Sequence, residues 1–175
     1  TYMKYDLQKS IEVLSRTPRT LEQLLTGLSD EWIYKNEGYA TWSVYDIVGH
    51  LIHGEKTDWI PRMKIILSDS PNRKFVPFDR FAQLQKDKKP LSALLVEFHV
   101  LRDQNISELQ AADISEKLLK RTGIHPEFEE VTLSQLLASW VAHDLNHIGQ
   151  IARVMAEKYK EAVGPWVPYI GILSQ

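Results

Sequence analysis

The stretch of residues 132 to about 159 is the feature that most constrains the fold of this chain. Its apolar residues recur every three or four positions, which is the spacing of one face of an α-helix. Thr132 followed by Gln135 has the pattern of a capping box, and Gly164-Pro165 is a strong stop signal beyond the segment. The sequence therefore predicts one long amphipathic helix with an apolar face that must be buried.

Three further segments show helical spacing. The first covers residues 7 to 28, with an interruption at Thr17-Pro18-Arg19-Thr20. The second begins at Ser43, a predicted N-cap whose capping box is completed by Asp46, and runs to about residue 67. Pro61 is expected to disturb this helix near its end. The third covers residues 91 to about 109.

The connections between these helices are long. Residues 69–90 are predicted to form a loop with a short turn at residues 78–81, and residues 111–130 are predicted to be irregular around Gly123-Ile124-His125-Pro126. No run of residues alternates as a half-buried strand does. We therefore expect one all-α domain over residues 1–175, a bundle of four main helices with extra short helices and long loops.

Composition excludes several classes of function. A formal net charge of -2 gives no electrostatic case for binding nucleic acid or an anionic membrane. No apolar run approaches the roughly 20 residues of a membrane span, and a cytoplasmic location is the default expectation. The chain has no cysteine, which excludes disulfides, Cys-ligated zinc and a protein thiol nucleophile. Any bound metal must have nitrogen and oxygen ligands.

The predicted last helix carries His143 and His147, four residues apart and thus one turn above each other. At about 100° of rotation per residue, His147 falls about 20° from the centre of the apolar stripe and His143 about 60° from it. Both rings are expected to face the bundle interior or its edge. A pair with this spacing is a recurring metal-ligand arrangement.

The predicted second helix carries His50 and His53. By the same rotation, His50 lies about 110° from the stripe centre, on a flank that can meet His143 and His147. His53 lies about 170° away and is expected to be solvated. The sequence thus favours a three-histidine site across two helices, with one or more open coordination positions, as in catalytic zinc sites.

Metal-bound histidines need hydrogen-bond acceptors for their second ring nitrogen. The candidates nearest in sequence are the side chains of Glu55, Asp58, Asp144 and Gln150. His125, in a predicted loop, is a further candidate for a fourth metal ligand or a substrate contact. A loop histidine more often has neither role. Asp79-Arg80 is expected to anchor its loop as an ion pair, with binding of an anionic substrate group as the alternative.

Two motifs resemble those of the DinB/YfiT-like superfamily of metal-dependent four-helix-bundle proteins. They are Trp42-Ser-Val-Tyr-Asp-Ile-Val-Gly-His50-Leu, with Glu55 shortly after, and Trp140-Val-Ala-His143-Asp-Leu-Asn-His147-Ile-Gly-Gln150-Ile. The resemblance implies an up-down-down-up bundle. It also implies one divalent ion, zinc or nickel, bound by His50, His143 and His147. The superfamily includes enzymes that use low-molecular-weight thiols, such as mycothiol-dependent maleylpyruvate isomerase and bacillithiol transferases.

The sequence leaves two classes of function open. The first is a metal-dependent transferase or hydrolase that acts on a small molecule, with an external thiol as a possible cofactor. The second is a non-enzymatic metal-binding or stress-associated bundle with a structural or vestigial ion. A zinc-protease helix is disfavoured because that motif requires glutamate where this chain has Asp144. A homodimer is also compatible with the sequence.

Overall fold

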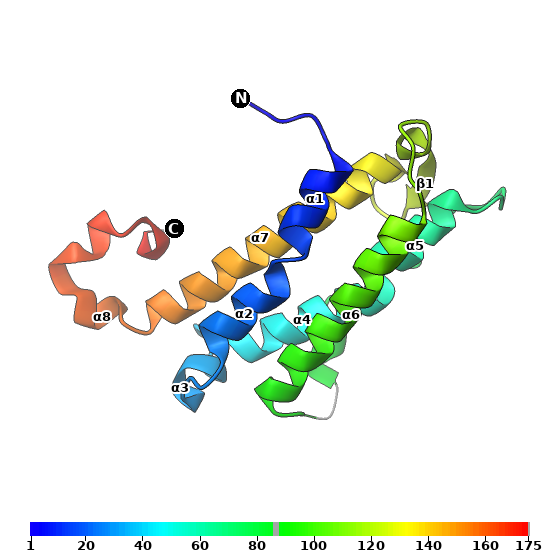
Figure 1. Ribbon diagram of the computed structural model, residues 1–175. Helices are drawn as coiled ribbons and strands as arrows, with labels where there is room; N and C mark the ends of the chain where they lie inside the picture. The colour runs from blue at the N-terminus through cyan, green and yellow to red at the C-terminus, as the bar shows by residue number, and fades with distance from the viewer. Residues whose placement is uncertain (86–87, 175) are drawn as a thin grey trace.

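The computed structural model describes residues 1–85 and 88–174 and is predominantly helical (Figure 1). Residues 86 and 87 of the predicted loop lie outside the described residues. Four long helical units form the bundle, two of them divided in two. Their elements are α1 (Leu7–Leu14), α2 (Thr17–Leu25), α4 (Val44–Thr57), α5 (Trp59–Leu67), α6 (Leu91–Ala111) and α7 (Leu133–Glu157).

Two hydrophobic clusters establish the direction of each helical unit. One joins the end of α2, the start of α4, the start of α6 and the end of α7, through residues such as Leu21, Leu25, Val48, Phe98 and Val154. The other joins α1, α5, the end of α6 and the start of α7, through residues such as Leu14, Met63, Leu109, Leu137 and Trp140. Hence α1–α2 and α7 run one way while α4–α5 and α6 run the other, which confirms the up-down-down-up bundle.

Both predicted capping boxes are present. Ser43 Oγ accepts a hydrogen bond from the Asp46 backbone N–H, and the Asp46 carboxylate accepts one from the Ser43 N–H at 2.9 Å. Thr132 and Gln135 exchange the equivalent pair at the start of α7. Each box satisfies backbone donors that a helix start leaves unpaired. These caps fix the start of the two helices that carry His50, His143 and His147.

The second helical unit is broken at Asp58 rather than at Pro61. Asp58 ends α4 and precedes α5 with φ −106° and ψ −78°, and Pro61 is the third residue of α5. The N–H groups in the first turn of a helix have no acceptor within the helix, so a proline there removes no hydrogen bond. Pro61 is tolerated because a new helix begins just before it. The predicted irregularity is therefore present but lies three residues earlier, and it removes Asp58 from the regular helical rotation.

The segment predicted to be irregular contains a small antiparallel hairpin, which corrects the expectation of no strands. β1 (Thr122–His125) pairs with β2 (Glu129–Thr132), with Thr122 opposite Thr132. The Phe75 N–H donates to the Ile124 carbonyl at 2.8 Å, which ties the chain just after α5 to this hairpin. Strands of four residues are too short to show an alternating pattern, so no strand is predicted from the sequence here.

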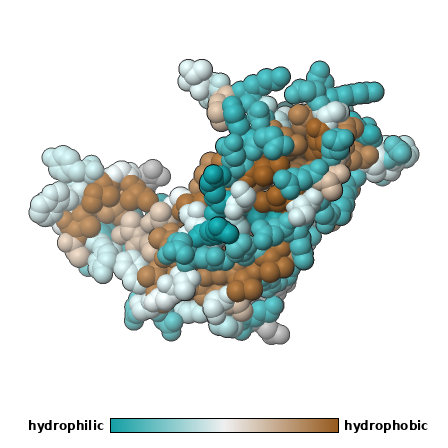
Figure 2. All heavy atoms as spheres, in the orientation of Figure 1, coloured by the Kyte–Doolittle hydropathy of each residue, from teal (hydrophilic) through white to brown (hydrophobic). Residues whose placement is uncertain are grey.

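Shorter elements complete the chain. They are α3 (Asp30–Ile33), α8 (Lys160–Val163) and the 3₁₀ turns η1 (Ala82–Gln85), η2 (Leu118–Lys120), η3 (Gly164–Tyr169) and η4 (Gly171–Leu173). The segment after α7 turns away from the bundle, and Leu173 is buried at its end (Figure 1). Figure 2 shows hydrophobic side chains gathered on this segment, where Trp166 and Tyr169 are exposed. The homodimer stays a prediction.

Within the described ranges, none of the helices combines the length and apolar character that a transmembrane span requires.

Candidate metal centre

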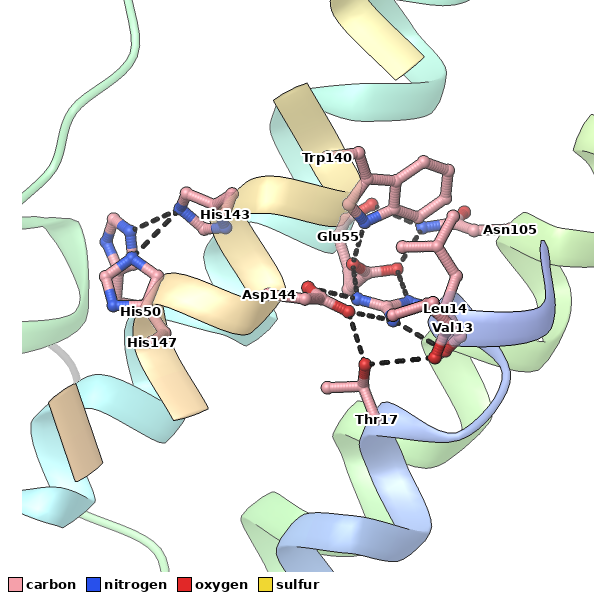
Figure 3. A network of polar contacts seen from close by, with 11 residues as sticks. Val13, Leu14, Thr17, His50, Glu55, Asn105, Trp140, His143, Asp144 and His147 are labelled. Carbon is pink, nitrogen blue, oxygen red and sulfur yellow. Dashed lines mark hydrogen bonds and ion pairs between the residues drawn. The ribbon is translucent and has the colours of Figure 1, made fainter. Parts of the chain in front are cut away.

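Three histidine side chains from two helices meet at one point. His50 lies on α4, and His143 and His147 lie one turn apart on α7 (Figure 3). The Nε2 atom of His143 is 3.1 Å from the Nε2 atom of His50 and 3.1 Å from that of His147. One nitrogen of each ring lies within 4.8 Å of the other two. The fold thus brings together the three histidines that the sequence singled out.

This spacing suits a single metal ion. Zinc–imidazole bonds are about 2.0–2.1 Å long, so two nitrogens of a tetrahedral site lie about 3.3 Å apart. Gln150 Oε1 lies 2.7 Å from His147 Nδ1. Because an amide oxygen only accepts hydrogen bonds, this contact assigns the proton of the neutral ring to Nδ1 and leaves the Nε2 lone pair facing the other two rings. Three converging Nε2 atoms are a donor set that fits one divalent metal ion and leaves a coordination position open.

The protonation states also suit ligands. Burial, assisted by the neighbouring imidazole of His147, lowers the pKa of His50 to about 4. Burial likewise lowers the pKa of His143 to about 3, with further contributions from His147 and His50. Burial lowers the pKa of His147 as well. All three rings are therefore neutral at pH 7, which is the form that binds a metal ion.

Aromatic side chains hold the rings in place. The Trp42 ring lies 4.8 Å from that of His50 and 6.4 Å from that of His147, measured between centroids. Phe78 meets His50 edge-on at 5.5 Å, and Trp59 meets His143 at 5.1 Å. These contacts restrict ring rotation, so the ligand atoms are oriented in advance of binding. Trp42 and Phe78 lie in connections between helices, where the spacing of residues in the sequence does not predict which way a side chain points.

The three histidines line a pocket of about 470 Å³ that is open to solvent. This volume is in the range of small-molecule sites. Aromatic and charged side chains line the rest of it, including Trp42, Phe78, Phe128, Asp58, Arg62 and Arg80. The break between α4 and α5 thus places Asp58 beside the histidines, and the loop before η1 places Phe78 and Arg80 there.

His125 lines the same pocket but lies outside the histidine cluster. Its Nδ1 accepts hydrogen bonds from the backbone N–H groups of Glu127 and Phe128, at 3.1 and 3.3 Å. Its ring stacks on Phe128 with a centroid distance of 4.4 Å. The structure therefore places His125 in the pocket wall, and its role as a substrate contact stays a prediction.

His53 also lies outside the cluster. It is half-buried, with its ring 4.9 Å from that of Phe78. His53 is therefore partly solvated rather than fully so, because Phe78 covers one side of its ring.

Asp58 and Arg62 form a buried pair at the wall of the pocket. Arg62 Nη1 lies 2.8 Å from Asp58 Oδ1, and the two residues are 7% and 8% exposed. Burial raises the pKa of Asp58 to about 6, although the charge of Arg62 acts in the opposite direction. A carboxyl group with this pKa can both take up and release a proton near neutral pH.

Glu55 and Asp144 lie away from the histidines, in a buried network around Arg102 (Figure 3). The Arg102 guanidinium donates five hydrogen bonds, to both Glu55 oxygens, to both Asp144 oxygens and to the Leu14 carbonyl. Thr17, Asn105 and Trp140 donate further bonds to the two carboxylates. Of the four candidates for orienting a histidine, Gln150 is the one hydrogen-bonded to a histidine of the cluster.

Sequence reasoning missed Arg102, Asn105 and Arg62. A signal for two of them exists: Arg102 and Asn105 fall on the apolar face of α6, four and seven residues after the buried Phe98. Charged or amide side chains on such a face need partners and mark a buried polar network. Arg62 follows Asp58 by four residues, which is ion-pair spacing on a helix.

Comparisons with known proteins agree with this architecture. A curated protein of Bacillus cereus named "Putative metal-dependent hydrolase" is 23% identical over 142 residues, which is 81% of this chain and 80% of the relative. A protein of Oceanobacillus iheyensis with the same description is 23% identical over 150 residues, or 85% of each chain.

Among solved structures, YfiT from Bacillus subtilis is similar with a TM-score of 0.75 and 22% identity, covering 90% of both chains. It is described as "a probable metal-dependent hydrolase with an unusual four-helix bundle topology". The family model described as the DinB superfamily matches residues 14–151. That range includes all three histidines and most of the bundle, and the chain belongs to the DinB superfamily.

Proposed function

We propose that this protein is a metal-dependent hydrolase of a small molecule, with His50, His143 and His147 as the ligands of one divalent transition ion. The observation that carries the proposal is the convergence of three Nε2 atoms at the wall of an open pocket. The names of the curated relatives support the same reaction class. Zinc or nickel is the expected ion, because imidazole nitrogen suits both.

An enzymatic role is favoured over a structural ion by the coordination that the chain offers. Within residues 1–85 and 88–174, the cluster contains three histidines and no fourth histidine or carboxylate. Structural zinc sites are closed by four protein ligands, whereas catalytic sites keep a position for water or substrate. The pocket beside the histidines gives a small molecule access to that position.

The bound ion would lower the pKa of a water molecule and polarise the bond to be cleaved. Asp58 is the group that moves the proton. Asp58 lines the pocket beside the histidines, so its carboxylate would accept a proton from water and return it to the leaving group. Gln150 keeps His147 in the ligand tautomer. Trp42 and Phe78 pack against the ring of His50 and keep it oriented.

Elemental analysis of the purified protein tests the metal site first. The wild type should contain about one equivalent of a transition metal after reconstitution, while H143A and H147A should contain none. H53A is the matched control and should retain the metal, because His53 lies outside the cluster. No metal in the wild type, or equal loss in all three variants, would reject the site.

Hydrolysis is tested with a panel of small esters, amides and lactones. D58N should keep the metal and lose hydrolysis, which separates proton transfer from metal binding. The same panel, repeated with a low-molecular-weight thiol and an electrophile, tests the thiol-transferase version of the proposal. Metal binding without either reaction would instead favour the non-enzymatic role.

A further inference from the structure

Arg80 is a cation of the pocket whose guanidinium forms no ion pair with any carboxylate of the described residues. It lies in the loop before η1, is exposed, and lines the same pocket as His50 and His143. Throughout residues 1–85 and 88–174, no carboxylate lies within ion-pair distance of its guanidinium. The neighbouring Asp79 instead accepts a hydrogen bond from the Phe81 N–H at 2.9 Å, so the expected Asp79–Arg80 ion pair is not formed.

Three other charged side chains line the pocket, those of Asp58, Arg62 and Glu127. Arg62 is paired with Asp58, so these two residues add no net charge. Glu127 is an exposed side chain at the pocket and, like Arg80, has no ion-pair partner among the described residues. Arg80 therefore offers a guanidinium whose donors are available to an incoming ligand. A guanidinium matches carboxylate and phosphate groups with two parallel hydrogen bonds.

The uncharged part of the pocket is apolar. Trp42, Phe78 and Phe128 present aromatic rings, and Pro77 and Pro126 lie beside them. Aromatic walls of this kind bind apolar or aromatic groups through burial and ring stacking.

We propose that the pocket binds a small organic anion, a carboxylate or a phosphate monoester carried on an apolar or aromatic body, with Arg80 binding the anionic group. This inference deepens the proposed function and rests on it in one respect, because it assumes that the substrate is cleaved at the end of the pocket formed by the histidines. The anionic group then sets the direction of the substrate: Arg80 holds one end, the aromatic rings hold the body, and the bond to be cleaved lies toward the histidines.

Equilibrium binding of three probes tests this assignment. Phenylacetate carries a carboxylate, phenyl phosphate carries a phosphate, and phenylacetamide is the neutral counterpart of the first. Calorimetry on the reconstituted wild type should show tighter binding of an anion than of the amide. R80Q should lose about tenfold of that preference, which corresponds to one charged hydrogen-bond contact of about 1.4 kcal/mol. R80K should retain part of it.

The matched control is R19Q. Arg19 is an exposed arginine of α2 outside this pocket, so R19Q should bind all three probes as the wild type does. Phenylacetamide should bind wild type and R80Q equally, which shows that the pocket is intact. The anion that shows the larger loss in R80Q, phenylacetate or phenyl phosphate, identifies the preferred group.

Two results would overturn the proposal. Either the anion preference is the same in R80Q and wild type, or neither anion binds the wild type at millimolar concentration. Repeating the series on chelator-treated protein separates this proposal from the proposed function. An Arg80-dependent preference that survives metal removal supports the anion site even if the hydrolase assignment fails, whereas a preference that disappears with the metal assigns the anion to the ion instead of Arg80.

Discussion

Replacing Arg102 with methionine should be among the most destabilising single changes in this protein. Arg102 is fully buried, and its five donors are bonded to Glu55, Asp144 and the Leu14 carbonyl at 2.6 to 3.1 Å. Methionine fills much of the volume of the aliphatic stem but supplies no donor. The change leaves two carboxylates buried, with side-chain exposures of 1% and 0% and no positive charge beside them.

The expected loss follows from those contacts. Removing one partner of a buried ion pair costs about 3–5 kcal/mol, and the unpaired Leu14 carbonyl adds about 1 kcal/mol. The total, about 4–6 kcal/mol, is comparable with the whole stability of a small domain. Hydrogen bonds from Thr17, Asn105 and Trp140 remain and keep the loss toward the lower end of this range.

Urea unfolding followed by circular dichroism measures this loss. K56M is the matched control, because it removes the cation of the partly exposed Lys56–Glu97 pair, and it should cost less than about 1 kcal/mol. An R102M protein that unfolds at nearly the same urea concentration as K56M would refute the reasoning. If R102M does not fold, T17V provides a milder test: it removes one buried bond to Asp144 and should cost about 2 kcal/mol, while T17S should not.

Three further predictions concern packing, protons and the ion. G123A should lose about 1–3 kcal/mol in urea unfolding, because a Cβ there would lie 2.5 Å from the Phe75 ring; unchanged stability would contradict this. Metal-free protein should lose stability between pH 7 and pH 5, since the unfolded chain protonates histidine near 6.5 while the folded pKa of His143 is about 3. H143Q should show a smaller loss. Chelation at pH 7 should remove the ion without a loss of helical circular dichroism; cooperative unfolding would indicate a structural ion.

Helical rotation explains which parts of the site were predictable from sequence. Gln150 follows His147 by three residues, a rotation of about 60° back to the same face, and the two are hydrogen-bonded. His143 and His147 share a face for the same reason. The capping boxes at Ser43 and Thr132 identified the residues at which the two histidine-bearing helices begin. That these histidines bind a metal stays a prediction.

The same rotation shows why nearness in sequence misplaced Asp144 and Glu55. Asp144 is one residue from His143 and thus about 100° away around α7, while Glu55 is about 140° from His50 around α4. Both carboxylates turn to the core, where they meet Arg102. Asp58 reaches the pocket because the helix breaks at this residue. Pro61 signals a break in the sequence, but it does not identify Asp58 as the residue at which the helix stops.

The buried network and the histidine cluster are two consequences of one helix register. Buried ion pairs stabilise a fold little more than apolar side chains of the same volume would, so net stability does not account for Arg102. Five fixed donors, however, are all satisfied in one arrangement of the α1 end, α4, α6 and α7. A shift of α7 by one residue would unpair Asp144 and would turn His143 by about 100° away from His50. The contacts that exclude other registers in the core are therefore the same ones that place the three Nε2 atoms together.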